Sequence, residues 1–221
     1  MLAGEAVVAI WNGIAPEGRD EFYAWHLHEH MPERVGIPGF LRGRRYVAAT
    51  ADTQPEFFTL YEADTLQVLQ GSDYAGRLNA PTPGTRSATR HFRDTARALA
   101  PVLESRGPGL GGMLLTLRFD ATSAGLSALR GLIQRAADAP RVCGAHLLVA
   151  DDAASGARTA ESAGRRDIQA PPTWFALVEG TDAEALAAVL PETALTAAGA
   201  AGPFHRGVYR LEYMRTKTAF A

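Results

Sequence analysis

The sequence of 221 residues contains a single cysteine, Cys143. One cysteine cannot form a disulfide within its own chain, so we expect a protein of a reducing compartment, the cytoplasm. Cys143 lies in the apolar run 142–149, where a thiol more often packs as a small hydrophobic group than acts as a nucleophile. The chain therefore has no disulfide framework, and its chemistry must be sought in other residues.

Long apolar runs and blocks of basic residues are also missing. No stretch approaches the roughly 18 to 20 apolar residues that cross a bilayer, and the first residues lack the basic start and apolar core of a signal peptide. The formal net charge is -2 and the arginines are scattered, which argues against a nucleic-acid binder. The glycine-rich segment 109–112 precedes a predicted strand and so lacks the context of a phosphate loop. We expect no membrane partner and no nucleic-acid partner.

An internal repeat is present instead. Residues 55–62 and 172–179 both read P-x-(F/W)-F-x-L-x-E, with the aromatic content typical of strands. Around this motif each half of the chain has the same predicted order, β-α-β-β-α-β. The predicted strands are 6–12, 40–49, 56–62 and 88–98, then 113–119, 142–150, 173–179 and 205–214; the predicted helices are 20–33, 65–78, 123–137 and 182–190.

This order is that of the ferredoxin-like, split βαβ unit, an antiparallel sheet with both helices on one face. We therefore predict an α+β fold of two tandem repeats, residues 1–104 and 113–221, joined by a linker at 105–112. A long polar loop, 151–171, interrupts the second repeat. Because the strands are apolar on both sides, the two sheets should pack together as one intramolecular, pseudo-dimeric α/β barrel.

Three of the six histidines lie in one run, His26, His28 and His30. Histidine titrates near neutral pH, so the run is the first candidate for chemistry. On a helix His26 and His30 are one turn apart and share a face with Phe22, whereas His28 points elsewhere. We expect His26 and His30 to face the sheet, and His28 and Arg34 to face solvent. The corresponding helix of the second repeat has no histidine, so the site should be asymmetric.

Around this run the sequence resembles a known family. The strings EHMPER at residues 29–34, PGF at 38–40 and RRY at 44–46 are similar to the E-H-(L/M)-P-E-R…P-G-F…A-R-R-Y signature of a family of small bacterial proteins. The segment PTPGT at 81–85 is similar to that family's P-T-P-W-T, with Gly84 in place of tryptophan. The resemblance covers residues 6–100 and implies the dimeric α/β barrel superfamily, near its EthD-like and stress-responsive groups. That superfamily includes cyclases, isomerases, cofactor-independent oxygenases and haem degraders, so the resemblance leaves the reaction open.

Three interpretations of the histidine run compete. In the first, His30 is a general acid or base with His26 as its neighbour, oriented by Glu29, by Glu33 or by a tyrosine of the sheet. In the second, His26 and His30 are an i, i+4 pair of metal ligands, completed by Glu33 or a strand residue. In the third, the histidines only hydrogen-bond the backbone near Pro32, where proline removes a donor from the helix.

Four further residues are candidate substrate contacts. Tyr46 and Tyr61 lie on two predicted strands, and buried tyrosines often only pack, with the hydroxyl bonded. His91 and Arg93 should share one face of the fourth strand, where they would bind an anionic group. Paired polar residues on a strand are also typical of a solvated face.

The sequence thus supports a hypothesis of a cytoplasmic, cofactor-independent enzyme acting on a small aromatic or polyketide-like molecule through histidine acid–base chemistry. Whether the protein is an enzyme stays open. A non-catalytic ligand-binding or assembly module would lack a closed cavity beside His30 and would expose an apolar patch. A haem-binding or haem-degrading barrel and a divalent-metal site are further alternatives, and the fused barrel could pair as a homodimer.

Overall fold

A computed structural model gives the fold and describes residues 1–163, 165–170 and 172–217. Parts of the predicted loop 151–171 and of the second repeat 113–221, namely residues 164, 171 and 218–221, lie outside the described residues. Eight antiparallel strands close a barrel in the order β1-β3-β2-β8-β5-β7-β6-β4. They are β1 (Ala6–Ile14), β2 (Phe40–Ala48), β3 (Phe57–Ala63), β4 (Phe92–Arg106), β5 (Met113–Ala121), β6 (Val142–Val149), β7 (Trp174–Gly180) and β8 (Ala200–Thr216).

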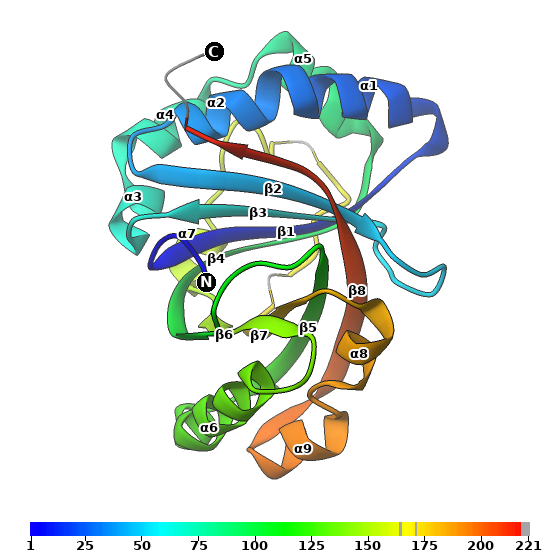
Figure 1. Ribbon diagram of the computed structural model, residues 1–221. Helices are drawn as coiled ribbons and strands as arrows, with labels where there is room; N and C mark the ends of the chain where they lie inside the picture. Colours follow the sequence, from blue (N-terminus) through cyan, green and yellow to red (C-terminus); the bar gives the residue numbers. More distant parts are fainter. Residues whose placement is uncertain (164, 171, 218–221) are drawn as a thin grey trace.

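Helices cover the barrel on two opposite sides (Figure 1). The first half supplies η1 (Pro16–Gly18), α1 (Arg19–Trp25), η2 (His26–His30), α2 (Met31–Gly36), α3 (Leu66–Gln70), α4 (Ser72–Asn79), α5 (Pro83–Ala88) and η3 (Thr89–His91). The second half supplies η4 (Ser123–Gly125), α6 (Leu126–Ala137), α7 (Asp152–Ser155), α8 (Ala183–Ala188) and α9 (Glu192–Ala197). The predicted α+β barrel is confirmed, and the order of its elements is compatible with the two predicted β-α-β-β-α-β repeats.

The two halves are joined edge to edge as well as face to face. Strand β2 pairs with β8, and the end of β4 pairs with β6, so both edges of each four-stranded sheet are used. Side chains of all eight strands meet inside the barrel in one buried cluster that includes Val7, Trp11, Phe58, Leu114, Leu148, Phe175 and Tyr209. Closure removes the exposed edges at which sheets aggregate.

Several predicted boundaries were wrong. The fourth strand begins at Phe92 rather than at residue 88, because Thr82 caps a helix there: its hydroxyl accepts a hydrogen bond from the Thr85 amide at 3.0 Å. The strand continues to Arg106, two residues into the predicted linker. The predicted helix 65–78 is two short helices, α3 and α4, separated at Gly71.

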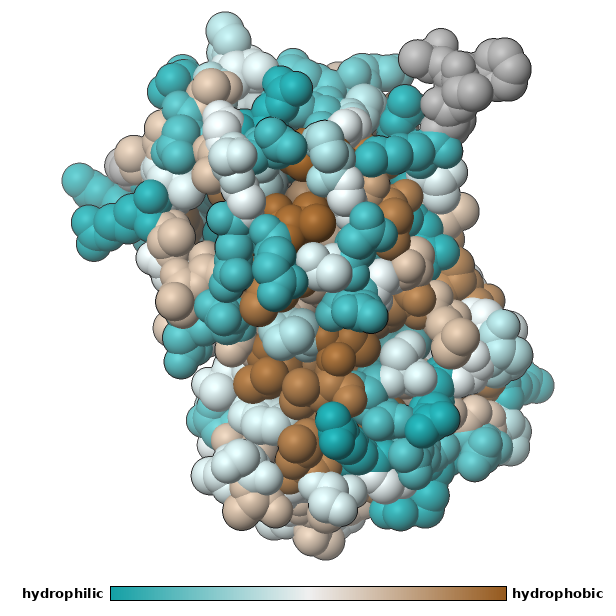
Figure 2. All heavy atoms as spheres, turned by 90° about the vertical axis from the view of Figure 1, so that its left-hand side faces the viewer, coloured by the Kyte–Doolittle hydropathy of each residue, from teal (hydrophilic) through white to brown (hydrophobic). Residues whose placement is uncertain are grey.

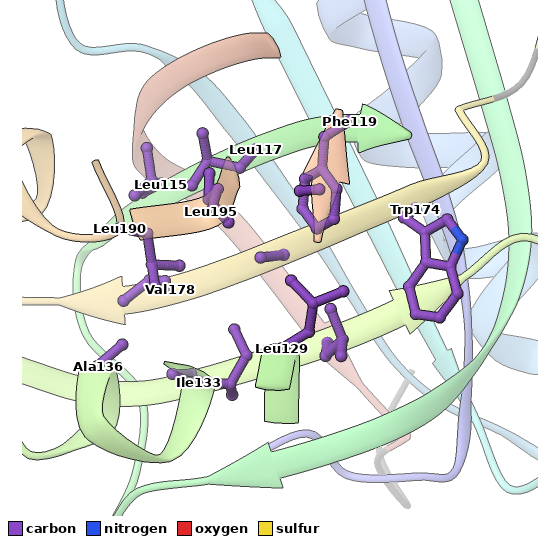
Figure 3. Packing of buried hydrophobic residues seen from close by; sticks show 14 of the residues in the cluster. Leu115, Leu117, Phe119, Leu129, Ile133, Ala136, Trp174, Val178, Leu190 and Leu195 are labelled. Carbon is purple, nitrogen blue, oxygen red and sulfur yellow. The ribbon is translucent and has the colours of Figure 1, made fainter. Parts of the chain in front are cut away.

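The helical layer of the second half is a packed apolar core. Helix α6 packs mainly on β6, and its Leu129, Ile133 and Ala136 share one buried cluster with residues of β5 and β7, namely Leu115, Leu117, Phe119, Trp174 and Val178 (Figure 3). The equivalent layer of the first half also has apolar clusters, but it buries the polar side chains of His26, His30 and Arg34 beside them, and this difference locates the candidate site.

Candidate functional site

The histidine run forms a π-helical turn, η2, between α1 and α2. In a regular α-helix, residues four apart drift by about 40° around the axis, and the wider π turn reduces that drift. One face of the helix therefore points toward the outer surface of the barrel wall. It carries Phe22, His26, His30 and Arg34, and each of these residues is at least 94% buried. His28 is exposed, as predicted. The expectation that Arg34 faces solvent was wrong, because the π turn keeps this four-residue series in line.

A small, partly enclosed cavity of about 50 Å³ lies between this helix and the outer faces of β1, β3 and β4. Its polar lining consists chiefly of Asn12, His26, His30, Arg34, Tyr61, Thr95 and Arg97. His26, His30 and Tyr61 of the predicted set are therefore together.

Two polar atoms at this cavity are buried without a partner. The Nδ1 atom of His30 and the hydroxyl of Tyr61 make no hydrogen bond to any described residue. The His30 ring lies over Trp25, with centroids 4.2 Å apart, and meets Tyr61 edge to face at 6.2 Å. Buried polar groups are rarely left unsatisfied, so both atoms point to a polar ligand or water in the cavity.

Burial makes both histidines neutral near physiological pH. It lowers the pKa of His26 to about 3, helped by the nearby Arg45 cation. Burial also lowers the pKa of His30 well below its usual value, with further contributions from Arg34 and His26. Arg45 Nη1 donates to His26 Nδ1 at 3.4 Å, which places the proton of His26 on Nε2. Burial raises the pKa of Tyr61, so its hydroxyl is a donor.

The cavity is covered by a segment of the second half, residues 159–163 and 165–169, which we call the strap. Glu161 of the strap forms an ion pair with Arg34 and donates its backbone N–H to Leu78 O at 3.0 Å. Thr95 donates its N–H to Asp167 O at 2.9 Å and accepts from Gln169 N at 2.7 Å. The long loop predicted at 151–171 thus supplies the roof of a site that belongs to the first half.

The remaining predicted residues lie outside the cavity. Tyr46 points into the barrel, where its hydroxyl accepts from Arg44 at 2.7 Å. His91 is in η3 rather than on β4, so it does not share a strand face with Arg93, and it pairs with Glu21 at 3.4 Å. Arg93 is exposed at the mouth of a neighbouring cleft.

The expected acidic neighbours of His30 bind elsewhere. Glu29 accepts a hydrogen bond from the Thr82 hydroxyl, and Glu33 pairs with Arg34 at 3.1 Å. A Cβ atom at Gly84 would lie 2.5 Å from the Glu29 carboxylate, so the family's tryptophan would require the Glu29 side chain to move. Within the described ranges no group of three or more His, Cys, Asp and Glu side chains could hold a metal ion.

Sequence reasoning missed Asn12, Arg34, Thr95 and Arg97. Asn12 is 2% exposed and is the one polar residue of the apolar strand 6–14 that could have signalled a site. It lies at a β-bulge, opposite both Asp94 and Thr95, because Trp11 pairs with Ala96 and Gly13 with Arg93. Bulges of this kind often turn side chains toward a site. Arg97 donates to the Tyr74 hydroxyl at 3.0 Å.

No family model matches the chain, and no curated protein matches it. Solved structures do. An anthrone oxidase-like protein is similar with a TM-score of 0.62 and 13% identity, over 98% of this chain and 95% of that one. A putative monooxygenase from Lactobacillus acidophilus NCFM has a TM-score of 0.58 and 10% identity, over 96% of both chains. A putative chlorite dismutase, TA0507, has a TM-score of 0.53 and 11% identity, over 95% and 96%.

At these identities the similarity shows the fold alone. The chain shares the α+β barrel of these structures, and the barrel predicted from the sequence is confirmed; the EthD-like group is not singled out. No helix in the described part of the chain is long and apolar enough to cross a membrane.

Proposed function

We propose that the protein is a cofactor-independent enzyme that removes a proton from an acidic C–H or O–H group of a small aromatic or polyketide-like molecule. The observation that carries the proposal is the buried pair of unpartnered groups, His30 Nδ1 and the Tyr61 hydroxyl, at one small cavity. A neutral imidazole has one free lone-pair nitrogen and can accept a proton, and a tyrosine hydroxyl can donate a hydrogen bond.

The electrostatics of the cavity favour an anionic product. Arg34, Arg97 and Arg165 line it. Arg34 pairs with Glu33 and Glu161, and Arg165 pairs with Asp167, so among the described residues the charge of Arg97 is the one without an ion pair. A substrate carbonyl that accepts a hydrogen bond from Tyr61 would develop negative charge as His30 takes the proton. Positive charge fixed in a dry site stabilises such an enolate or phenolate without solvent reorganisation. His26 would support His30 as its neighbour, and the strap would exclude water.

The size of the cavity limits what it can hold. At about 50 Å³ it is well below the roughly 300–1,000 Å³ of small-molecule sites, so in the closed form it takes only the reacting end of a substrate. A haem does not fit there, and the two larger clefts on either side of the strap have no histidine, tyrosine or cysteine among their described lining residues. We therefore derive no step through haem.

The names of similar proteins agree with this class of substrate. An anthrone oxidase-like protein and a putative monooxygenase share the fold. Anthrone is a tricyclic aromatic ketone with an acidic C–H group, so we choose it as the probe. Closer kinship with EthD-like and stress-responsive barrels is part of the proposal and is supported by the sequence at residues 29–46. So is a cytoplasmic location, supported by the single cysteine.

The test is hydrogen–deuterium exchange at the acidic carbon of anthrone in D₂O, followed by NMR. We expect the protein to accelerate exchange and His30→Ala to slow it by about 100-fold or more, the range of general base catalysis. His28→Ala is the matched control, since His28 is exposed in the same turn, and it should keep the full rate. Equal rates for the wild type and His30→Ala would refute the role of His30.

A second candidate is an assembly role. Hydrophobic side chains gather on one face of the molecule, between the two helical layers (Figure 2). A patch of this kind is typical of contact surfaces, and a homodimer of the fused barrel would cover it. Light scattering across a hundredfold range of concentration tests this. A monomer throughout would reject the homodimer and leave the enzyme proposal intact.

A further inference from the structure

A second hollow adjoins the His30 cavity. It is a cleft of about 730 Å³ between α5, η3, the start of β4 and the strap, and it has the size of small-molecule sites. Thr89, Phe92, Glu161 and Arg165 line both the cleft and the cavity. A molecule in the cleft could therefore reach His30 if the strap side chains between the two spaces moved.

The cleft is rich in arginine although the chain as a whole is slightly acidic. Five arginines line it against three acidic residues. Two of these acids are already engaged, Glu161 with Arg34 and Asp167 with Arg165 at 2.6 Å. In the described ranges the other four arginines take part in no ion pair: Arg86, Arg90, Arg93 and Arg166. The excess positive charge faces the open side of the cleft.

The backbone holds Arg93 in this position. Asp94, in the bulge opposite Asn12, has a φ of 51°, which redirects the chain between Arg93 and Thr95. Arg93 Nη1 donates to Arg90 O at 3.0 Å and to Phe92 O at 2.8 Å. Its other guanidinium nitrogens make no hydrogen bond to a described residue, so they can donate to an oxyanion in the cleft, which Arg90 also lines.

We infer that this cleft binds an oxyanion group, a carboxylate or a phosphate, carried by the substrate whose reacting end enters the His30 cavity. The inference rests on the proposed function and narrows it to acidic substrates. Arg90 and Arg93 hold the anionic group, and the strap lies between the two ends of the molecule. The volume of the cleft is that of a small-molecule site, so a small molecule fits better than a nucleic acid.

Binding is tested without catalysis, by titrating benzoate and inorganic phosphate into ¹⁵N-labelled protein. We expect amide shifts confined to residues of the cleft, and at least about tenfold weaker binding in Arg90→Gln/Arg93→Gln. The control Arg135→Gln/Arg210→Gln removes two exposed arginines that do not line the cleft and should bind as the wild type does. Preference for benzoate or for phosphate identifies the group.

Three results would overturn the inference: no binding of either anion to the wild type, equal binding by both double variants, or tight binding of a short oligothymidylate with none of benzoate or phosphate. A kinetic comparison links the cleft to the reaction. Anthrone-2-carboxylate should be favoured over anthrone in kcat/KM by about tenfold, and Arg90→Gln/Arg93→Gln should abolish that preference. If neither compound reacts, the proposed function fails while the binding result stands.

Discussion

At the scale of single residues, His30 and Tyr61 are the most informative side chains. Each has a polar atom buried without a partner in the described structure, and each such atom costs about 1–3 kcal/mol of stability. Hydrophobic side chains at these positions would avoid that cost, as Leu129 and Ile133 do in the helical layer of the second half. Their presence is explained if the cavity binds something polar.

Replacing Tyr61 by phenylalanine should separate function from stability. The hydroxyl makes no hydrogen bond in the described structure, so its removal should not lower the free energy of unfolding and should raise it by about 1–3 kcal/mol. Loss of a donor to the developing oxyanion should slow anthrone exchange by about 100-fold. Urea denaturation and the NMR exchange assay check the two effects. A large loss of stability with an unchanged rate would mean that Tyr61 only packs.

The pH dependence of the exchange follows from the lowered pKa of His30. The group acts as a base only when neutral, and burial holds its pKa well below its usual value in the folded protein. The enzyme-catalysed rate should therefore not decline as the pH falls from about 7 to about 5.5, a range in which an unperturbed histidine would become protonated. A midpoint near the unperturbed value in the rate profile would contradict the burial of the base.

The inward position of His26 and His30 was predictable from their four-residue spacing and is confirmed by their burial. The inward position of Arg34 was not predictable, because the π turn that aligns it has no clear signature in the sequence. Tyr46 and Tyr61 alternate on neighbouring strands, and pattern alone could not tell which of them faces the helices. Only the register of β2 against β3 places Tyr46 inside the barrel and Tyr61 in the cavity.

At the scale of elements, the strap links the two repeats functionally. It belongs to the second repeat in sequence but bonds to β4 and to the end of α4 in the first. The existence of the loop 151–171 was therefore predictable from its composition, whereas its position over the site was not predictable. Contacts between residues more than sixty positions apart leave no trace in local patterns.

A cross-link across the strap tests whether it must open. Asn79 Oδ1 accepts a hydrogen bond from the backbone N–H of Ala160 at 3.1 Å, so Asn79→Cys/Ala160→Cys places two thiols close together. Because anthrone exceeds the closed cavity, the oxidised variant should lose at least about tenfold in exchange rate and regain it with dithiothreitol. Asn79→Cys alone is the control. Full activity of the oxidised form would show that substrate enters another way.

At the scale of the whole molecule, the barrel was predictable from the internal repeat because two amphipathic sheets in one chain can cover each other. The pairs β2–β8 and β4–β6, which close it, could not be read from the sequence. Nor could the buried ion network at one end of the barrel. There Arg44 pairs with Glu62 at 2.8 Å and with Glu179 at 2.9 Å, and His146 lies 3.4 Å from Glu179.

Removing one member of this network should be costly. Burial alone raises the pKa of Glu179, but His146 and Arg44 together lower it to about 2, so the carboxylate is charged. Glu179→Ala should reduce the free energy of unfolding by about 3 kcal/mol, because it leaves Arg44 partly uncompensated in the interior. Glu56→Ala removes a partly exposed ion pair with Arg19 and should cost less than about 1 kcal/mol. Equal losses in urea denaturation would contradict this ranking.

The central claim, that His30 is the base of an enzyme, is tested most directly by chemical rescue. His30→Gly should slow anthrone exchange by about 100-fold or more and leave space for an added imidazole ring. Free imidazole should then restore at least about a tenth of the lost rate, with saturation, and should not accelerate the wild type in the same way. A folded His30→Gly protein that exchanges anthrone as fast as the wild type would contradict the account.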